Sequence, residues 1–186
     1  MNYPKYIIYN NTEIPINWDF RAGIEFEKLI YDSSISEEER LIKILENYFK
    51  LLPKIDEPHL LINEILKFYR CGKELPRINE EDDVIRKKQA YDFVEDWGYI
   101  HAAFLQQYRV DLNTVKNLHW WQFKGMFESL DENTQFKKIL GFRLIKIDSK
   151  MSKEQKKYYN EMKEIYKLPD KRTQEEIDEE FANAFF

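Results

Sequence analysis

The apolar residues of this chain recur mostly at steps of three and four, the spacing that places side chains on one face of an α-helix. The clearest case begins at Ser36, which forms a capping-box pattern with Glu39, and Pro53 is expected to stop the helix. Its predicted apolar face comprises Leu41, Ile44, Leu45, Tyr48, Phe49 and Leu52. This pattern predicts an amphipathic helix over about 36–52.

Two more helices and a hairpin are predicted in the first half. One helix begins at Asp19, and its apolar face comprises Phe20, Gly23 or Ile24, Phe26 and Ile30. The other ends near Gly72, as is typical of a glycine that follows a helix, and it contains Leu60, Leu61, Ile65, Leu66, Phe68 and Tyr69. Ahead of both, the apolar runs 5–9 and 13–16 flank Asn10-Asn11, which predicts a β-hairpin or a bent arm.

The longest predicted helix covers about 84–108, and residues 109–116 then reverse the chain. Its apolar stripe comprises Val94, Trp97, His101, Phe104, Leu105 and Tyr108, widened by Tyr91, Phe93 and Ile100. A helix that is apolar around so much of its circumference is expected inside the domain, packed from more than one side.

The stretch LHWWQFKGMF, residues 118–127, predicts the next helix. Its core face comprises Trp120, Phe123, Phe127 and Leu130, at steps of three, four and three. Gly125 costs about 1 kcal/mol relative to alanine in a helix interior, so we expect another backbone to approach closely there. A further helix follows Asp131-Glu132-Asn133 and carries Phe136, Ile139, Leu140 and Arg143-Leu144.

Two shorter helices complete the prediction. Each begins with a capping-box pattern, Ser152 with Gln155 and Thr173 with Glu176. The apolar residues of the second are Ile177, Phe181, Ala184, Phe185 and Phe186. The predicted fold class is mainly α, a compact helical bundle of about six to eight helices with a short N-terminal β-hairpin or arm.

The predicted helices group into two domains. Residues 1–148 are expected to form one helical domain that includes the N-terminal arm, and residues 149–186 a helical extension. The clearest break within the first domain is 72–83, where a glycine, a proline and four acidic residues predict a linker or mobile loop.

Composition narrows the classes of function. Aromatic residues make up 16% of the chain, more than one small core is expected to absorb, which favours interfaces between proteins. A net charge of −5, with both signs mixed along the chain, argues against nucleic-acid binding. A membrane span needs about 20 consecutive apolar residues, and no apolar run approaches this length. No signal peptide is evident. We therefore expect a cytoplasmic protein that does not bind membranes.

The candidate catalytic and metal-binding residues have plainer structural interpretations. His101 on the core stripe is more typical of a hydrogen-bonded structural histidine, and His119 opens the next helix. Cys71 lies near basic residues that lower a thiol pKa, but it lacks an identifiable base. A single cysteine and three scattered histidines give no zinc motif. We expect no catalytic residue, metal or cofactor.

Two other clusters also have plainer structural interpretations. Asp92 and Asp96 are one helical turn apart, with Glu95 between them, so paired carboxylates are conceivable. The solvated side of the long helix is the favoured interpretation. Trp120 is expected in the core, whereas Trp121 is a candidate for an interface.

Three segments resemble the bacteriophage gene-product-fifteen family of tailed phages and prophages. These are YDFVEDWGYIHAAFLQQYRVDL, LHWWQFKGMFESL and TQFKKILGFRLIKI. The opening of the chain, YIIYNNTEIPINWDFRAGIEFEKLI, is also similar, with Asp19, Phe20 and Arg21 at the start of its first helix. The resemblance covers roughly residues 5–148.

The resemblance implies a protein of the phage tail module with no known enzymatic activity. Genes of this family typically lie just upstream of the tape-measure gene, where tail assembly chaperones are found. The implied function is a non-catalytic chaperone that binds the tape-measure protein and tail-tube proteins, forms homo-oligomers, and acts in the host cytoplasm. The proposed partner-binding residues are Trp121, Ile177, Phe181, Phe185 and Phe186.

Two alternatives stay open. The protein is alternatively a structural tail or head–tail connector component that is retained in the virion. A third possibility is a small enzyme or inhibitor directed at a host factor, in which His101 would act with Asp96 or Asp92.

Overall fold

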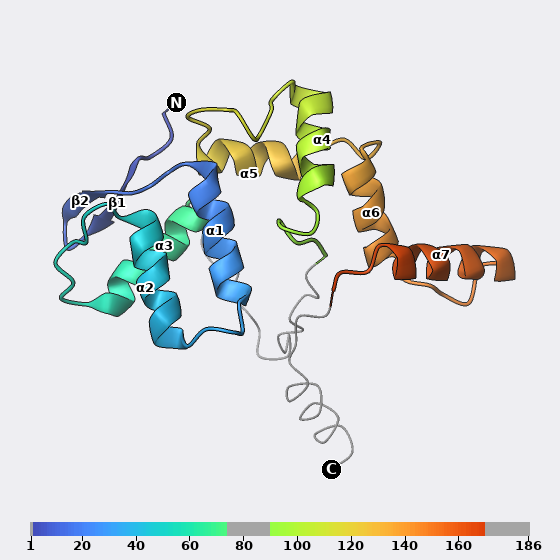
Figure 1. Cartoon of the computed structure of the whole chain (residues 1–186), viewed down its shortest axis with the longest axis horizontal. Helices are drawn as coiled ribbons and strands as arrows, with labels where there is room; N and C mark the ends of the chain where they lie inside the picture. Colours follow the sequence, from blue (N-terminus) through green and yellow to red (C-terminus); the bar gives the residue numbers. More distant parts are fainter. Residues whose placement is uncertain (1, 74–89, 170–186) are drawn as a thin grey trace, which may run out of the picture.

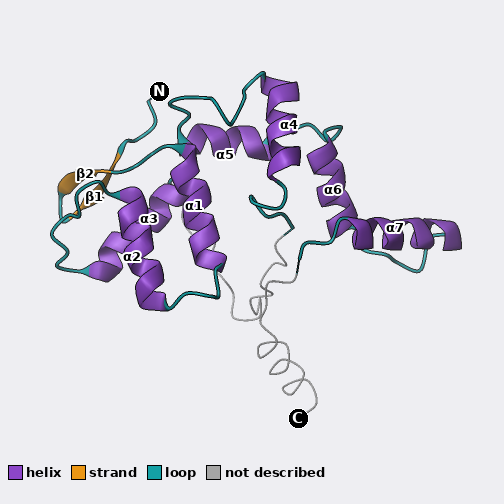
Figure 2. Cartoon of the chain, viewed as in Figure 1, coloured by secondary structure: helices purple, strands orange, loops and turns teal. Residues whose placement is uncertain are grey.

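The computed structural model describes residues 2–73 and 90–169 of the 186-residue chain (Figure 1). Helices dominate it, with one small sheet near the N-terminus (Figure 2). The elements are β1 (Tyr6–Tyr9), β2 (Thr12–Pro15), α1 (Phe20–Tyr31), α2 (Glu37–Tyr48), α3 (Pro58–Tyr69), α4 (Trp97–Tyr108), α5 (Trp120–Glu128), α6 (Gln135–Leu144) and α7 (Lys153–Ile165). The expected fold class, mainly α with an N-terminal hairpin, is confirmed.

The predicted hairpin forms with the turn that its sequence indicates. Asn10 and Asn11 both adopt positive φ, 50° and 58°, which closes β1 and β2 into a tight antiparallel ribbon. β1 packs on α3, with Ile7 and Tyr9 buried. The Tyr9 hydroxyl accepts hydrogen bonds from the backbone amides of residues 56 and 57, so the hairpin satisfies donors at the start of α3.

The core is built around Trp120 at the start of α5, where α1 packs against α5. The Trp120 ring is fully buried, and it lies directly over Gly23 of α1. A Cβ added to Gly23 would meet Trp120 Cε3 at 2.2 Å, so only glycine fits there. Phe20 and Phe123 stack beside this contact with ring centroids 5.0 Å apart. The predicted core face of α5 is therefore confirmed.

The close approach expected at Gly125 is wrong. A Cβ at Gly125 would meet nothing within 4 Å. A glycine within a predicted helix does not by itself show where two helices touch, because an exposed glycine and a packed one look the same in the sequence. The glycine that allows close packing is Gly23.

Helix bounds differ from the prediction in two places. α2 ends at Tyr48 rather than at Pro53, because Phe49 is extended and buried, while Leu52 is exposed. α4 begins at Trp97 rather than near residue 84; residues 90–96 form bends and turns, and 84–89 lie outside the described residues. Val94 and Leu105 are exposed, so the expected continuous stripe is also wrong.

The start of α1 connects distant segments of the chain. The Asp19 carboxylate caps the helix by accepting from the backbone amide of Arg21 at 3.0 Å. The Arg21 guanidinium donates to the carbonyls of Leu112 and Val115, both at 3.0 Å. The acid-aromatic-arginine start of this helix therefore anchors the loop between α4 and α5.

Helices α6 and α7 lie at the opposite end of the molecule from the hairpin (Figure 1). α6 packs on α4, and α7 packs on α6. The capping box predicted at Ser152 and Gln155 is present, with both reciprocal hydrogen bonds formed. No residue of α7 is buried.

Candidate functional site: surfaces for partner binding

The adjacent tryptophans of α5 close the C-terminal end of α3. The indole N–H of Trp120 donates to the carbonyl of Tyr69 at 2.7 Å, and that of Trp121 to the carbonyl of Phe68 at 2.8 Å. Helix ends leave such carbonyls without an intrahelical donor. Cys71 and Gly72 adopt positive φ there, which ends α3 as the sequence predicted.

Trp121, the first predicted partner-binding residue, is half-buried. Its ring lies close to Gly72 and packs edge-on against Tyr3 of the N-terminal arm, with ring centroids 6.3 Å apart. Its role in binding a partner stays a prediction. The other four predicted residues, Ile177, Phe181, Phe185 and Phe186, lie outside the described residues.

His119 has a structural role. Its Nδ1 accepts a hydrogen bond from the backbone amide of Trp121, capping α5, so Nε2 carries the proton and donates to the carbonyl of Pro4 at 2.7 Å. The ring stacks on Trp18 and Tyr3. Burial lowers the pKa of His119 below its usual value, which keeps the imidazole neutral as this cap requires.

His101 also has a hydrogen-bonded partner. Its Nε2 lies 2.9 Å from the Asp111 carboxylate in the loop after α4. This hydrogen bond holds the pKa of Asp111 below its ordinary value. Asp96 is bound elsewhere, so the described residues do not bring His101 and Asp96 together in the pairing considered for an enzyme.

The interpretation of Asp96 as part of a solvated helix face is wrong. Asp96 is 1% exposed and forms two hydrogen bonds to the guanidinium of Arg143 in α6, at 2.7 and 2.9 Å. Arg143 also donates to the carbonyls of Ala90 and Tyr166. The pair therefore joins the segment before α4 to α6 and to the end of α7. Asp92 is not on a helix but caps the turn at Val94.

The expected effect of basic neighbours on the pKa of Cys71 is present, but burial outweighs it. Burial raises the pKa of this thiol to about 11, and the nearby Lys124 and Lys73 only partly oppose the effect. A thiol with a raised pKa is a poor nucleophile near neutral pH.

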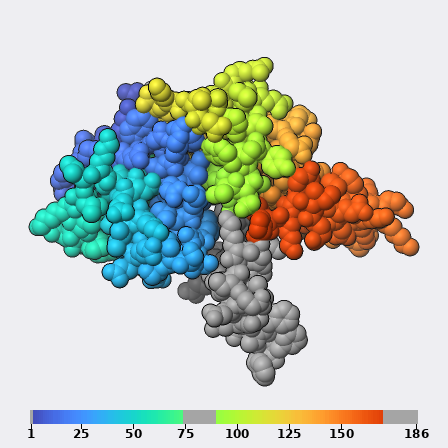
Figure 3. All heavy atoms as spheres, in the orientation of Figure 1, coloured from blue at the N-terminus to red at the C-terminus, as the bar shows by residue number. Residues whose placement is uncertain are grey.

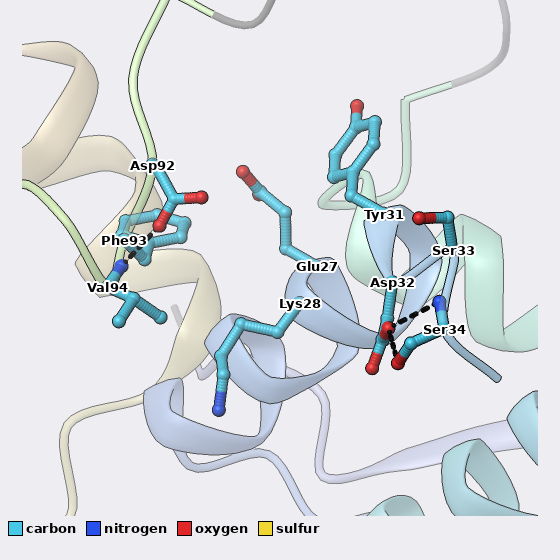
Figure 4. A pocket seen from close by; sticks show the side chains of 9 residues that line it. All are labelled: Glu27, Lys28, Tyr31, Asp32, Ser33, Ser34, Asp92, Phe93 and Val94. Carbon is cyan, nitrogen blue, oxygen red and sulfur yellow. Dashed lines mark hydrogen bonds between the residues drawn. The ribbon is translucent and has the colours of Figure 1, made fainter. Parts of the chain in front are cut away.

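A cavity of about 310 Å³ lies between the second half of α1 and the segment before α4 (Figure 4). Glu27 and Asp92 face this space in the close-up. Glu27 is buried and accepts a hydrogen bond from the Tyr69 hydroxyl. Burial raises the pKa of Glu27, opposed by its hydrogen bonds to Tyr69 and Tyr91. These hydrogen bonds join α1, α3 and residue 91, so the buried carboxylate of Glu27 has a structural role.

An apolar surface with a concave shape lies between α6 and α7. We call it the α6–α7 groove; its volume is about 460 Å³, and its lining residues are Lys138, Gly141, Phe142, Leu144, Ile145 and Tyr159. Leu144 is 61% exposed, and the adjacent α7 residues Tyr158 and Ile165 are 48% and 65% exposed. Phe142 is one of the lining residues, and its ring packs against those of Tyr158 and Tyr166.

The part of the chain that the structure describes contains no cluster of His, Cys, Asp or Glu suited to a metal ion. Over the same residues, no helix combines the length and hydrophobicity that a bilayer crossing requires.

These observations define a mainly α protein with an aromatic core and an exposed apolar groove at one end. The family model described as Bacteriophage Gp15 protein matches residues 3–168, so the chain belongs to this family. Membership identifies a bacteriophage protein of the structural or assembly class. No curated protein and no solved structure showed significant similarity. The match extends beyond residue 148 and includes α7; the division into domains at that point stays a prediction.

Sequence reasoning missed Glu27 and Arg143 as internal polar residues. Both have a detectable signal, because each falls at helical spacing with core residues: Glu27 with Phe20 and Gly23, and Arg143 with Phe136 and Ile139. A charged residue on a buried face needs a partner. The partner of Arg143, Asp96, lies 47 residues away in the chain and cannot be predicted from local spacing.

Proposed function

We propose that this protein is a non-catalytic tail assembly chaperone that binds and shields the tape-measure protein and self-associates during tail assembly in the host cytoplasm. The tail-tube proteins are its other proposed partners. Family membership supplies the phage structural or assembly class, and the chaperone role goes beyond it.

The observation that carries the proposal is the exposed α6–α7 groove. Leu144, which lines the groove, and its neighbours Tyr158 and Ile165 in α7 leave much of their apolar area in water, although α7 is amphipathic and has a capped start. A chaperone for a long apolar helix needs such a surface, because an amphipathic helix can place its apolar face in a groove between two helices.

The rest of the molecule supports the same role by being closely packed. Trp120, Phe123 and Phe20 are fully buried around Gly23, and Asp96 with Arg143 connects this core to α6. A groove held by a packed scaffold loses little conformational entropy on binding.

The binding test is co-expression of the full chain with tagged tape-measure segments. Leu144→Glu in the groove is compared with Leu51→Glu, since Leu51 is 88% exposed and lies outside the groove. Burial of one leucine contributes about 1.5–3 kcal/mol, so the groove variant should weaken binding at least about tenfold. The control should match the wild type. Equal retention of tape-measure segments by both variants would contradict the proposal.

Virion composition tests the alternative. A chaperone leaves before the particle matures, so quantitative mass spectrometry of purified virions should find this protein far below the level of tail proteins. A stoichiometric amount would instead establish a structural tail or connector component.

A further inference from the structure

We infer that the α6–α7 groove is covered, in the free protein, by residues 173–186 of the same chain, and that this segment competes with the helical partner for the groove. The competition with a helical partner rests on the proposed function. Coverage of the groove by residues 173–186 does not depend on that function. Three observations carry it: a surplus of basic charge in α6, α7 and the residues next to them, the composition of the segment, and the length of the connection.

The first observation is a surplus of positive charge. Residues 135–169 contain ten Lys and Arg and only four Asp and Glu. Within the described ranges 2–73 and 90–169, just two of the ten pair with a carboxylate, Lys137 with Glu132 and Arg143 with Asp96. Lys138 lines the groove without such a pair. The chemistry that suits this groove is therefore an acidic amphipathic helix.

The second observation is that residues 173–186, TQEEIDEEFANAFF, have this chemistry. The segment contains five acidic residues and no basic one. Its sequence predicts a helix that begins with the capping-box pair Thr173 and Glu176, and its apolar residues are Ile177, Phe181, Ala184, Phe185 and Phe186. The acidic charge thus accompanies rings that could cover Leu144 and Phe142.

The third observation is the connection. α7 ends at Ile165, with Tyr166 as its cap, so six residues, 167–172, connect it to Thr173. Helix-to-helix connections of 2–8 residues are typical of bundles. A helix of 14 residues is about 21 Å long and α7, with 13, is about 20 Å, so the segment matches α7 in length. A short tether also gives the segment a millimolar effective concentration at the groove.

The direct test uses the full chain with p-benzoylphenylalanine in place of Leu144, whose exposed side chain tolerates the change. Unlabelled and ¹⁵N-labelled chains are mixed, irradiated and digested, and the cross-linked peptides are identified by mass spectrometry. We expect a link from position 144 to a peptide of 173–186 with both halves carrying the same label. The same photo-cross-linker at Leu51 should give no link to that segment.

Three outcomes would overturn the inference. A mixed-label link would place the segment of a second copy in the groove. Absence of any link to 173–186, or an undiminished link in the Ile177→Asp/Phe181→Asp double variant, would show that the segment does not cover it. We expect the double variant to reduce the link at least tenfold.

Competition is tested with a tape-measure segment as the probe. If nine-tenths of the wild-type molecules are covered, the Ile177→Asp/Phe181→Asp variant should bind the probe about tenfold more tightly. Equal affinities of wild type and variant would overturn the competition. If neither binds the probe, the proposed chaperone function fails, whereas the cross-linking result still decides whether the segment covers the groove.

Discussion

The two ends of this molecule treat aromatic side chains in opposite ways. Around α1, α3 and α5, Trp120, Phe20 and Phe123 have no accessible surface, and the polar atoms of both α5 tryptophans have partners. Around α6 and α7, Tyr158 and Phe142 pack against each other but remain accessible. Figure 3 shows α6 and α7 projecting beyond α4 at one edge of the molecule.

The difference shows that ring content by itself does not define a core. Both regions have aromatic residues at helical spacing, yet within the described ranges 2–73 and 90–169 the rings of the first region are covered and those of α6 and α7 remain partly accessible. The core is packed so closely that even a methyl group added at Gly23 would clash with Trp120. The α6–α7 unit is an incomplete layer whose apolar face needs another helix.

The largest expected effect is at the junction of the two regions. Asp96→Ala leaves the buried guanidinium of Arg143 without its carboxylate, which should reduce the free energy of unfolding by about 3–5 kcal/mol. Urea denaturation followed by circular dichroism measures it. Lys43→Ala removes an exposed ion pair with Glu39 and should have no measurable effect. A small loss for Asp96→Ala would mean that the two regions are held together by other contacts.

The next largest effect compares two glycines. Gly23→Ala forces a Cβ into the Trp120 ring, and overpacking of this kind should cost about 3 kcal/mol. Gly125→Ala meets open space and should stabilise the protein by about 1 kcal/mol, because alanine favours the helix. Thermal denaturation of both variants measures the two changes, and we expect a lower melting temperature for Gly23→Ala and a higher one for Gly125→Ala. A neutral Gly23→Ala would show that the core can shift to admit a methyl group.

A smaller effect depends on pH. The folded protein holds His119 neutral, so as pH falls through about 6.5 the unfolded chain binds a proton first and the free energy of unfolding decreases. His119→Asn keeps a capping side chain but does not titrate. The stability advantage of the wild type over this variant should therefore shrink between pH 7.5 and pH 5.5. An advantage that stays constant would contradict the neutral cap.

The smallest effect is expected on α7 beside the groove. Ile165→Glu places charge on a side chain that is already 65% exposed and does not line the groove, so stability should change by less than about 0.5 kcal/mol. Chemical denaturation of this variant checks it. A loss as large as that of Gly23→Ala would mean that α7 is part of the folded core, and would remove the contrast between the regions.

Local patterns in the sequence predicted local structure well and long-range structure poorly. The hairpin turn, the caps at Ser36 and Ser152, and the buried face of α5 follow from residues within a few positions of one another. The bond between Asp96 and Arg143, and the contact of Gly23 with Trp120, join residues far apart in the chain. Of the predicted partner-binding residues, only Trp121 lies within the described part of the chain, where its position by the N-terminal arm could not have been foreseen.

The hydrogen bonds from the paired indoles to α3 give the protein built-in optical probes. An indole that is buried and bonded to a carbonyl has a different fluorescence emission from one in water, so separation of α3 from α5 would alter the signals of Trp120 and Trp121 together. Trp18, which stacks on His119, and Trp97, which bonds to Asn113, report on other contacts. Replacing those two with phenylalanine would leave a molecule whose light emission follows one helix junction as partners are added.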